Sequence, residues 1–372
     1  MHRMKAWGAA AFVAVLAASG AVAGQAAAAA NELKIISIDA EGGASTLYIT
    51  PDGHSLLIDA GWAARPAGPG RTPDAPPRPA TPATAQAVVA AMKANGLTKL
   101  DYLLVSHFHI DHISGVPALA AAVPIGAFID HGPNRELTLE GPPGGPPGPT
   151  GNENYRATIA GKTHIVMKAG QSMKLGQLTL TAVNGDREIV RHRLGRAVPA
   201  DPGCQSLTYK TDDGGEENPR SLGLILQWGT TRILSLGDTT WDMENKLVCP
   251  ANLIGPVDLM VISNHGSDLS NAPVLLNSVK PRVVIVNNGA TKGGDGVVLD
   301  RLAGLTPKPA VWQVHFATRS PEQNVAPDQI ANLAGPDAVN PLVVTVDKKG
   351  AVTVQNPRNG FTKTYRRGGP AE

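Results

Sequence analysis

The sequence predicts an α/β protein of the α+β type, in which two halves pack as a four-layer αββα sandwich. In each half, β-rich segments come first and helical segments follow. The apolar runs 100–106 and 257–263 have the length and composition of strands buried in a sheet. The segments 222–228 and 231–236 flank Gly229 and predict a hairpin.

The first half begins with an antiparallel unit. Strands are expected over 32–39, 45–50, 55–59 and 100–106. Pro51, Asp52 and Gly53 form a turn between two of them. A helix is expected over 84–95, with Thr84 as its N-cap and Gly96 as its stop.

The second half continues the alternation of strands and helices. Beyond the 222–236 hairpin, elements are expected over 240–247 (a helix), 257–263 (a strand), 274–279, 283–287 and 311–314, with a closing hairpin of 342–346 and 351–355. The Pro- and Gly-rich runs 63–84 and 141–151 are interpreted as surface insertions. Residues 31–372 are therefore predicted to form one domain with two loop insertions.

The N-terminus has the pattern of a secretory signal peptide. Arg3 and Lys5 precede an apolar, Ala-rich stretch that runs to about Ala23, and small residues follow. We expect residues 1–30 to be a leader cleaved near 23–30, and the mature chain to be periplasmic or secreted. A membrane anchor is the alternative, although this stretch is weakly apolar for a stable span, and no later segment is long and apolar enough to cross a bilayer.

Charge and cysteine content indicate which partners and which cysteine states are consistent with the sequence. The formal net charge of +2 falls to zero once Arg3 and Lys5 leave with the leader, and aromatic residues are only 4%. The net charge and the low aromatic content therefore do not favour binding of the whole chain to nucleic acid. A local basic groove is still consistent with the sequence. Cys204 and Cys249 are the only cysteines; a disulfide and two buried free thiols are both consistent with their positions.

One short run carries the strongest chemical signal. His107, His109, Asp111 and His112 lie within six residues, directly after the buried strand 100–106. Imidazole and carboxylate groups bind zinc and similar divalent ions. Alternation places His107 and His109 on one side, and the following turn lets Asp111 and His112 reach a second ion. We therefore expect a metal site here.

The His-x-His-x-Asp-His run resembles the signature of the metallo-β-lactamase superfamily. Leu57 to Gly61 resembles its first motif, which implies that Asp59 orients the ligands and the loop backbone. Leu236-Gly237-Asp238 resembles the motif whose carboxylate bridges two metals; a helix N-cap is the alternative role for Asp238.

The segment 261–267 resembles the final histidine motif of the superfamily, and within it the competence (ComEC) branch. That branch commonly has His-His-Gly-Ser, whereas this chain has Asn264 before His265. His265 is the expected ligand, while alignment by strand end would favour position 264. Asn218 lies in an Asn-x-x-Ser run like that of the branch, where many relatives have a third histidine. It could be a weak ligand or a hydrogen-bond donor beside the metal.

The remaining candidates are weaker. His131 follows a strand and is expected to line the pocket, whereas His164 and His192 are expected at the surface. His315 ends the strand 311–314; a substrate or supporting contact and a place in the core stay equally open. Asn287, Asn288 and Lys292 are interpreted as a polar loop rather than as substrate contacts.

The resemblance implies a hydrolase with two divalent ions bridged by Asp238 and an activated water. Asp111 has two open roles: a ligand of the second ion, or an acceptor that orients the water. Zinc is the default metal, and an oxygen-rich site with Asn218 could prefer manganese. Three hypotheses follow: hydrolysis of a phosphodiester, with nucleic acid an open substrate; hydrolysis of a lactone, lactam or other small-molecule ester; or a periplasmic binding protein that has lost catalysis.

Overall fold

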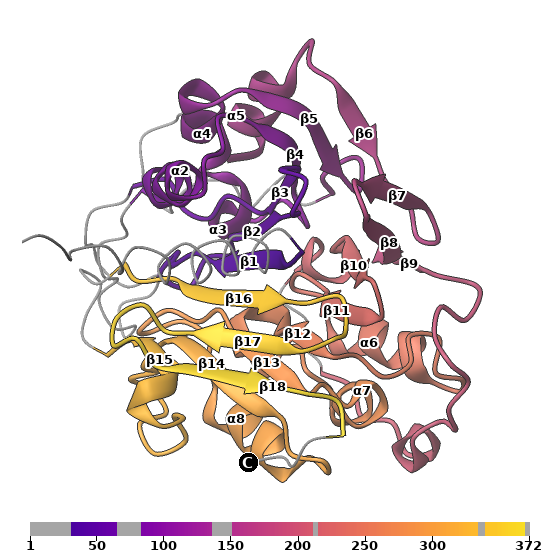
Figure 1. Ribbon diagram of the computed structural model, residues 1–372. Helices are drawn as coiled ribbons and strands as arrows, with labels where there is room; N and C mark the ends of the chain where they lie inside the picture. The colour runs from indigo at the N-terminus through magenta and orange to yellow at the C-terminus, as the bar shows by residue number, and fades with distance from the viewer. Residues whose placement is uncertain (1–30, 65–82, 136–150, 211–214, 334–338, 369–372) are drawn as a thin grey trace, which may run out of the picture.

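The computed structural model describes residues 31–64, 83–135, 151–210, 215–333 and 339–368. It confirms the predicted mixed α/β sandwich, with two large sheets and helices on their outer faces (Figure 1). The expected leader 1–30 lies outside the described residues, as do positions 65–82 and 141–150 of the two expected insertions.

The first sheet has the strand order β18-β17-β16-β1-β2-β3-β4-β5-β6. It combines the N-terminal strands with the C-terminal hairpin, because β1 pairs with β16 in antiparallel register. Strands β3 to β6 are parallel neighbours. The strands are β1 (Leu33–Ser37), β2 (Thr46–Ile49), β3 (Ser55–Ile58), β4 (Leu100–Leu104), β5 (Ile125–Asp130), β6 (His164–Val166), β16 (Leu342–Val346), β17 (Val352–Gln355) and β18 (Thr362–Tyr365).

The second sheet has the order β15-β14-β13-β12-β11-β10-β8-β7, and β9 pairs with β8. Strands β11 to β15 are parallel, so their carboxyl ends meet at one edge. The strands are β7 (Ser172–Leu175), β8 (Leu178–Gly185), β9 (Glu188–Ile189), β10 (Gly223–Trp228), β11 (Thr231–Ser235), β12 (Leu259–Val261), β13 (Val283–Val286), β14 (Ala310–His315) and β15 (Ile330–Asn332).

Helices cover the outer face of each sheet. The apolar sides of α2, α3, α4 and α5 pack with Leu57 and Leu103 of the first sheet. Those of α6, α7 and α8 pack with Leu234 and Met260 of the second. The helices are α2 (Thr84–Ala94), α3 (Ile110–Ile113), α4 (Val116–Ala122), α5 (Gly151–Ile159), α6 (Trp241–Val248), α7 (Pro273–Val279) and α8 (Gly296–Gly304), with short 3-10 turns η1 (Pro202–Gln205), η2 (Asn218–Arg220), η3 (Ser263–Gly266) and η4 (Pro327–Gln329).

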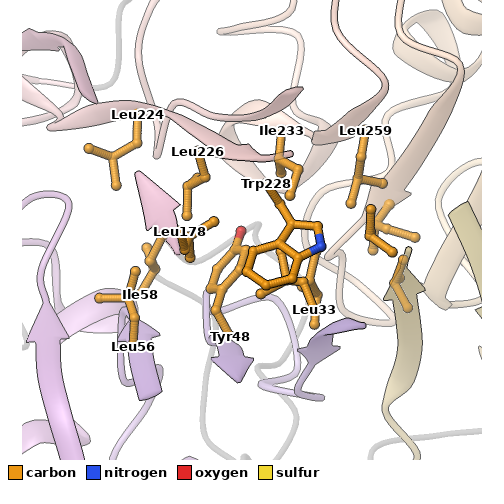
Figure 2. Close-up of a cluster of buried hydrophobic side chains, with 14 of the residues drawn as sticks. Leu33, Tyr48, Leu56, Ile58, Leu178, Leu224, Leu226, Trp228, Ile233 and Leu259 are labelled. Atoms are coloured by element: carbon orange, nitrogen blue, oxygen red, sulfur yellow. The ribbon is translucent and has the colours of Figure 1, made fainter. Parts of the chain in front are cut away.

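The central core lies between the two sheets. Successive strand residues point to opposite faces, so Leu56 and Ile58 face the inner core while Leu57 faces the helices. Tyr48 of β2 and Trp228 of β10, both labelled in Figure 2, belong to this cluster of buried side chains. Both are fully buried, and a buried aromatic side chain contributes about 1.5–3 kcal/mol or more. This core holds the two sheets in a fixed relation, and the candidate site depends on that relation.

Several local details differ from the predictions. The N-cap of α2 is Ala83, not Thr84, because the Thr84 hydroxyl instead accepts a hydrogen bond from Trp62 N at 3.1 Å. Cys204 and Cys249 form a disulfide, with their Cα atoms 5.5 Å apart. Within the described part of the chain, no helix is both long and apolar enough to span a membrane.

Candidate metal centre

Loops at the carboxyl ends of parallel strands from both sheets meet at one place. Asp59 follows β3, and the 107–112 run follows β4. Asp238 follows β11, and His265 follows β12 in the second sheet. Carboxyl ends of parallel strands commonly form ligand sites, because their loops project from the same edge.

Four side chains offer metal-binding atoms within 4.8 Å of one another; they are Asp111, His112, Asp238 and His265. His112 Nε2 lies 3.4 Å from one oxygen of each carboxylate. His265 Nε2 lies 3.1 Å from Asp111 Oδ2 and 3.5 Å from Asp238 Oδ2. Ligands about 2.1 Å from a tetrahedral ion stand about 3.4 Å apart, so this spacing fits one divalent ion.

Asp59 supports the centre from behind. Its Oδ1 accepts a hydrogen bond from Ser106 N at 2.7 Å, and its Oδ2 accepts from the Ser106 hydroxyl at 2.8 Å. Oδ2 also lies 2.8 Å from His112 Nδ1. A proton on Nδ1 leaves the Nε2 lone pair of His112 directed toward Asp111 and Asp238. His112 Nε2 is buried without a hydrogen bond from any described residue, as expected of an atom that binds a cation.

The charged groups of the centre shift one another's pKa values. Burial opposes ionisation of Asp111, but Lys292 and His112 hold the pKa of that carboxyl well below its usual range. Burial likewise opposes ionisation of Asp238, whose pKa is held well below its usual range by His112 and His265. Burial lowers the pKa of His107 well below its usual value. Burial opposes the charge of His112, but Asp238 and Asp111 raise the pKa of that imidazole well above its ordinary value. Since ionised carboxylates and neutral imidazoles are the forms that bind metal ions, a bound ion would take the place of the His112 Nε2 proton.

His107 and His109 form a second, less complete donor group beside the first. His107 Nε2 lies 3.1 Å from His109 Nδ1 and 3.9 Å from Asp238 Oδ2. Asn218 lies in the adjoining segment and is buried. Its Oδ1 accepts no hydrogen bond from the described residues. The residues on either side of this segment bond to the centre, because Glu217 accepts from Phe108 N and the Ser221 hydroxyl accepts from Asp238 N.

The structure brings the His265 side chain, rather than Asn264, to the carboxylates. Both residues have left-handed backbone conformations, with φ of 54° and 48°. Asn264 N donates to Gly237 O at 2.9 Å, which ties this turn to the loop of Asp238. Gly237 is required there, because a Cβ would come within 2.9 Å of Ser106 Cβ at a φ of +58°. Asp238 itself is not a helix cap, since the N-cap of α6 is Thr240.

Four other histidines singled out in the sequence lie outside the four-donor group. His131 Nε2 pairs with Glu217 at 3.0 Å, and its ring packs against Phe108, so it supports the 107–112 loop from below instead of lining an open pocket. His164 is one-third exposed and pairs with Asp130 at 2.8 Å. His192 is exposed, as expected. His315 joins Asp39 and Glu41 in a separate buried cluster.

Sequence reasoning missed the roles of Lys292 and Glu217. Lys292 was expected in a polar loop, but its ammonium contacts Asp111 Oδ2 and lies 5.2 Å from the Trp62 ring centroid. Glu217 is buried and also accepts a hydrogen bond from Arg135 N at 2.8 Å. The only available signals were the glycines around Lys292 and the position of Glu217 before Asn218.

Comparisons with known proteins agree with this fold. Residues 39–172, about a third of the chain, match the family model described as the metallo-β-lactamase superfamily. The match contains Asp59 and the 107–112 run and ends before Asp238. No curated protein sequence matches the chain significantly.

Several solved structures are similar at low identity. A variant of the CmlA β-hydroxylase has 14% identity and a TM-score of 0.42, over 77% of this chain and 52% of its own. A metallo-β-lactamase variant from Cronobacter sakazakii has 17% identity and a TM-score of 0.30, over 52% of this chain and 56% of its own. A diphosphatase of the PhnP family has 11% identity and a TM-score of 0.32, over 68% of this chain and 85% of its own. The chain spans about half the length of the first two of these structures.

Proposed function

We propose that this protein is an exported, metal-dependent hydrolase, and that its substrate is a phosphodiester. The convergence of Asp111, His112, Asp238 and His265 from three separate segments carries the proposal. Packing alone gives no reason to bury two carboxylates between two imidazoles at the end of two sheets.

The donors divide into two groups that share one carboxylate. One ion would be held by Asp111, His112, Asp238 and His265. A second would be held by His107 and His109 together with Asp238, and the buried Asn218 Oδ1 would be a further ligand. When bound, divalent ions lower the pKa of water and polarise the electrophile.

The protein's own residues prepare this chemistry. Asp59 holds His112 in the tautomer that presents Nε2, and the buried Ser106 hydroxyl holds Asp59 in turn. Asp111 Oδ2 is close to both His112 and His265, which favours a role as ligand over one as a free base.

Lys292 supports an anionic substrate. Its side chain is 41% exposed and stands at the edge of the centre against Asp111. Once Asp111 is engaged by a cation, the ammonium is available to a negatively charged group that approaches from solvent. The resemblance of residues 218–222 and 261–267 to motifs of the competence branch supports the same substrate class. The 4% aromatic content gives no sign of base stacking, so nucleic acid remains only one of the phosphodiesters to be tested.

The disulfide supports export. Cys204 and Cys249 form a disulfide, and such bonds persist mainly in oxidising compartments such as the periplasm. This agrees with the leader expected over residues 1–30 and with a periplasmic or secreted location.

The decisive test combines metal content with three substrates. We would measure bound metal, then assay bis(p-nitrophenyl) phosphate, a lactone and nitrocefin, each with added Zn²⁺ or Mn²⁺. The proposal expects metal-dependent turnover of the phosphodiester, and the Asp238→Asn variant as control should lack it. Turnover of only the lactone or nitrocefin would move the substrate to the ester or lactam class. A metal-loaded protein that turns over none of the three would instead indicate a binding protein.

A further inference from the structure

A second cluster of charged side chains lies inside the fold, apart from the donors described above. Asp39 and Glu41 follow β1 of the first sheet, and His315 ends β14 of the second. Their exposed fractions are only 2%, 4% and 1%. His315 Nε2 lies 2.8 Å from Asp39 Oδ1 and 3.1 Å from Glu41 Oε2.

The hydrogen bonds of this cluster leave one oxygen without a donor. Asp39 accepts from Glu41 N at 2.9 Å and from Asn332 Nδ2 at 3.2 Å. Glu41 Oε1 accepts from Ala290 N at 2.9 Å. The one proton that His315 Nε2 can carry is directed to Asp39, so Glu41 Oε2 receives no hydrogen bond from the described residues.

The charges are also unbalanced. Two carboxylates face one imidazole, so even an imidazolium leaves a net negative charge in the interior. Among the described residues, Asp39 and Glu41 form ion pairs with His315 alone. A buried carboxylate without a compensating cation is strongly unfavourable. Burial also raises the pKa of Glu41 above its ordinary value.

From this orphaned oxygen and the uncompensated charge, we propose that Asp39 Oδ1, Glu41 Oε2 and His315 Nε2 bind a further divalent cation. Ligands in cis positions about 2.1 Å from an octahedral ion stand about 3.0 Å apart, which is close to the 2.8 and 3.1 Å found here. Two carboxylate oxygens and one imidazole nitrogen suit an ion such as Mn²⁺ better than a thiolate-preferring ion.

The position of the cluster indicates what this cation would do. The loop 39–45 contacts the first centre directly, because Ala44 N donates a hydrogen bond to Asp111 O at 3.1 Å. Gly42 packs so closely on Lys292 that a Cβ would come within 2.7 Å of the lysine Cβ. An ion bound to Asp39, Glu41 and His315 would tie this loop to β14 and hold the backbone that carries Asp111 and Lys292. The proposal concerns this cluster only and does not depend on the hydrolase activity.

The test compares metal content between matched variants of the full chain. Each protein is stripped with EDTA, dialysed against MnCl2 and analysed by plasma mass spectrometry and Mn²⁺ electron paramagnetic resonance. Glu41→Gln keeps the shape of the side chain and the acceptor for Ala290, but it removes the anionic oxygen. We expect this variant to bind one equivalent less than the unmodified chain. Glu244→Gln, the same substitution at a buried carboxylate outside the cluster, should bind the unmodified amount.

Equal metal content in Glu41→Gln and the unmodified chain would overturn the proposal. In that case, removal of an uncompensated buried charge should raise the melting temperature of the variant in EDTA, which would assign the cluster to hydrogen bonding alone. A second measurement tests the proposal even if the Glu41→Gln variant does not fold. The double variant Asp238→Asn/His112→Ala, which disables the first centre, should still bind one Mn²⁺, and binding of none would equally reject the site.

Discussion

The two histidine–carboxylate clusters use the same types of side chain and are both buried, but the first borders a partly exposed lysine. In the first, Asp111, His112, Asp238 and His265 stand beside a lysine that is 41% exposed. In the second, Asp39, Glu41 and His315 are each at most 4% exposed. Metal-binding side chains alone therefore do not make an active site. The first cluster borders the partly exposed Lys292, whereas the second is placed to support the loop 39–45, which contacts the first.

The largest expected difference between the clusters is catalytic. Asp238→Asn should reduce kcat/KM by about a thousandfold or more, because Asp238 faces three imidazoles; this equals about 4 kcal/mol in the activation free energy. His315→Gln should reduce it less than about tenfold, since that residue never meets substrate. Steady-state kinetics on both variants measures the contrast, and equal losses would remove the distinction between the clusters.

Glu244 offers a buried carboxylate that forms no ion pair with a described residue, although Arg301 is near enough to lower its pKa slightly, and Glu41 can be compared with it. It accepts hydrogen bonds from Asn271 N and Ala272 N, and burial raises its pKa from 4.5 to about 7. A raised folded-state pKa gives stability that is complete below pH 4.5 and is lost as the pH rises through 7. Relative to Glu244→Gln, the unmodified chain should lose about 3 kcal/mol of unfolding free energy between pH 4.5 and 8.

Urea unfolding of both proteins across this pH range measures the effect of Glu244. If Glu41 binds a cation, the matching comparison with Glu41→Gln in saturating Mn²⁺ should show no such decline over the same range. Parallel pH profiles for the two pairs would argue that Glu41, like Glu244, is an uncompensated carboxylate.

Asp59 should affect only the first cluster. Asp59→Asn removes the acceptor that holds His112 Nδ1 and should weaken metal binding there by about 10- to 100-fold. Asp130→Asn is a suitable control, because Asp130 bonds His164 at the same distance of 2.8 Å but lies outside both clusters. Calorimetric titration with Zn²⁺ should separate the two variants, and equal affinities would contradict the supporting role of Asp59.

Lys292 should have the smallest effect, and a selective one. Lys292→Met is expected to raise KM about tenfold for an anionic phosphodiester, equivalent to about 1.4 kcal/mol, and to leave KM for a neutral ester unchanged. Lys292→Arg should restore most of the binding, because it keeps the positive charge. A uniform change for both substrates would show that the lysine supports Asp111 rather than recognises substrate charge.

The parts of this protein that depend on local pattern could be predicted from the amino-acid sequence alone. The buried run 100–106, followed by His107, His109, Asp111 and His112, predicted both a core strand and a metal-binding turn, because period and side-chain chemistry are readable over a few residues. The hairpins and the layered α/β class were predicted on the same basis. Thr84 is an exception even at this local level. Its hydroxyl accepts a hydrogen bond from Trp62 N of another segment and does not cap the helix.

Contacts between distant residues depend instead on how the two sheets pack. Ala290 N reaches Glu41 across 249 positions of the chain, and His265 reaches Asp111 across 154. Such contacts are set by the packing of the two sheets around Tyr48 and Trp228, and no local period encodes them. For the same reason Lys292 read as an ordinary loop residue, and the Asp39, Glu41 and His315 cluster could not be recognised before the two sheets were brought together.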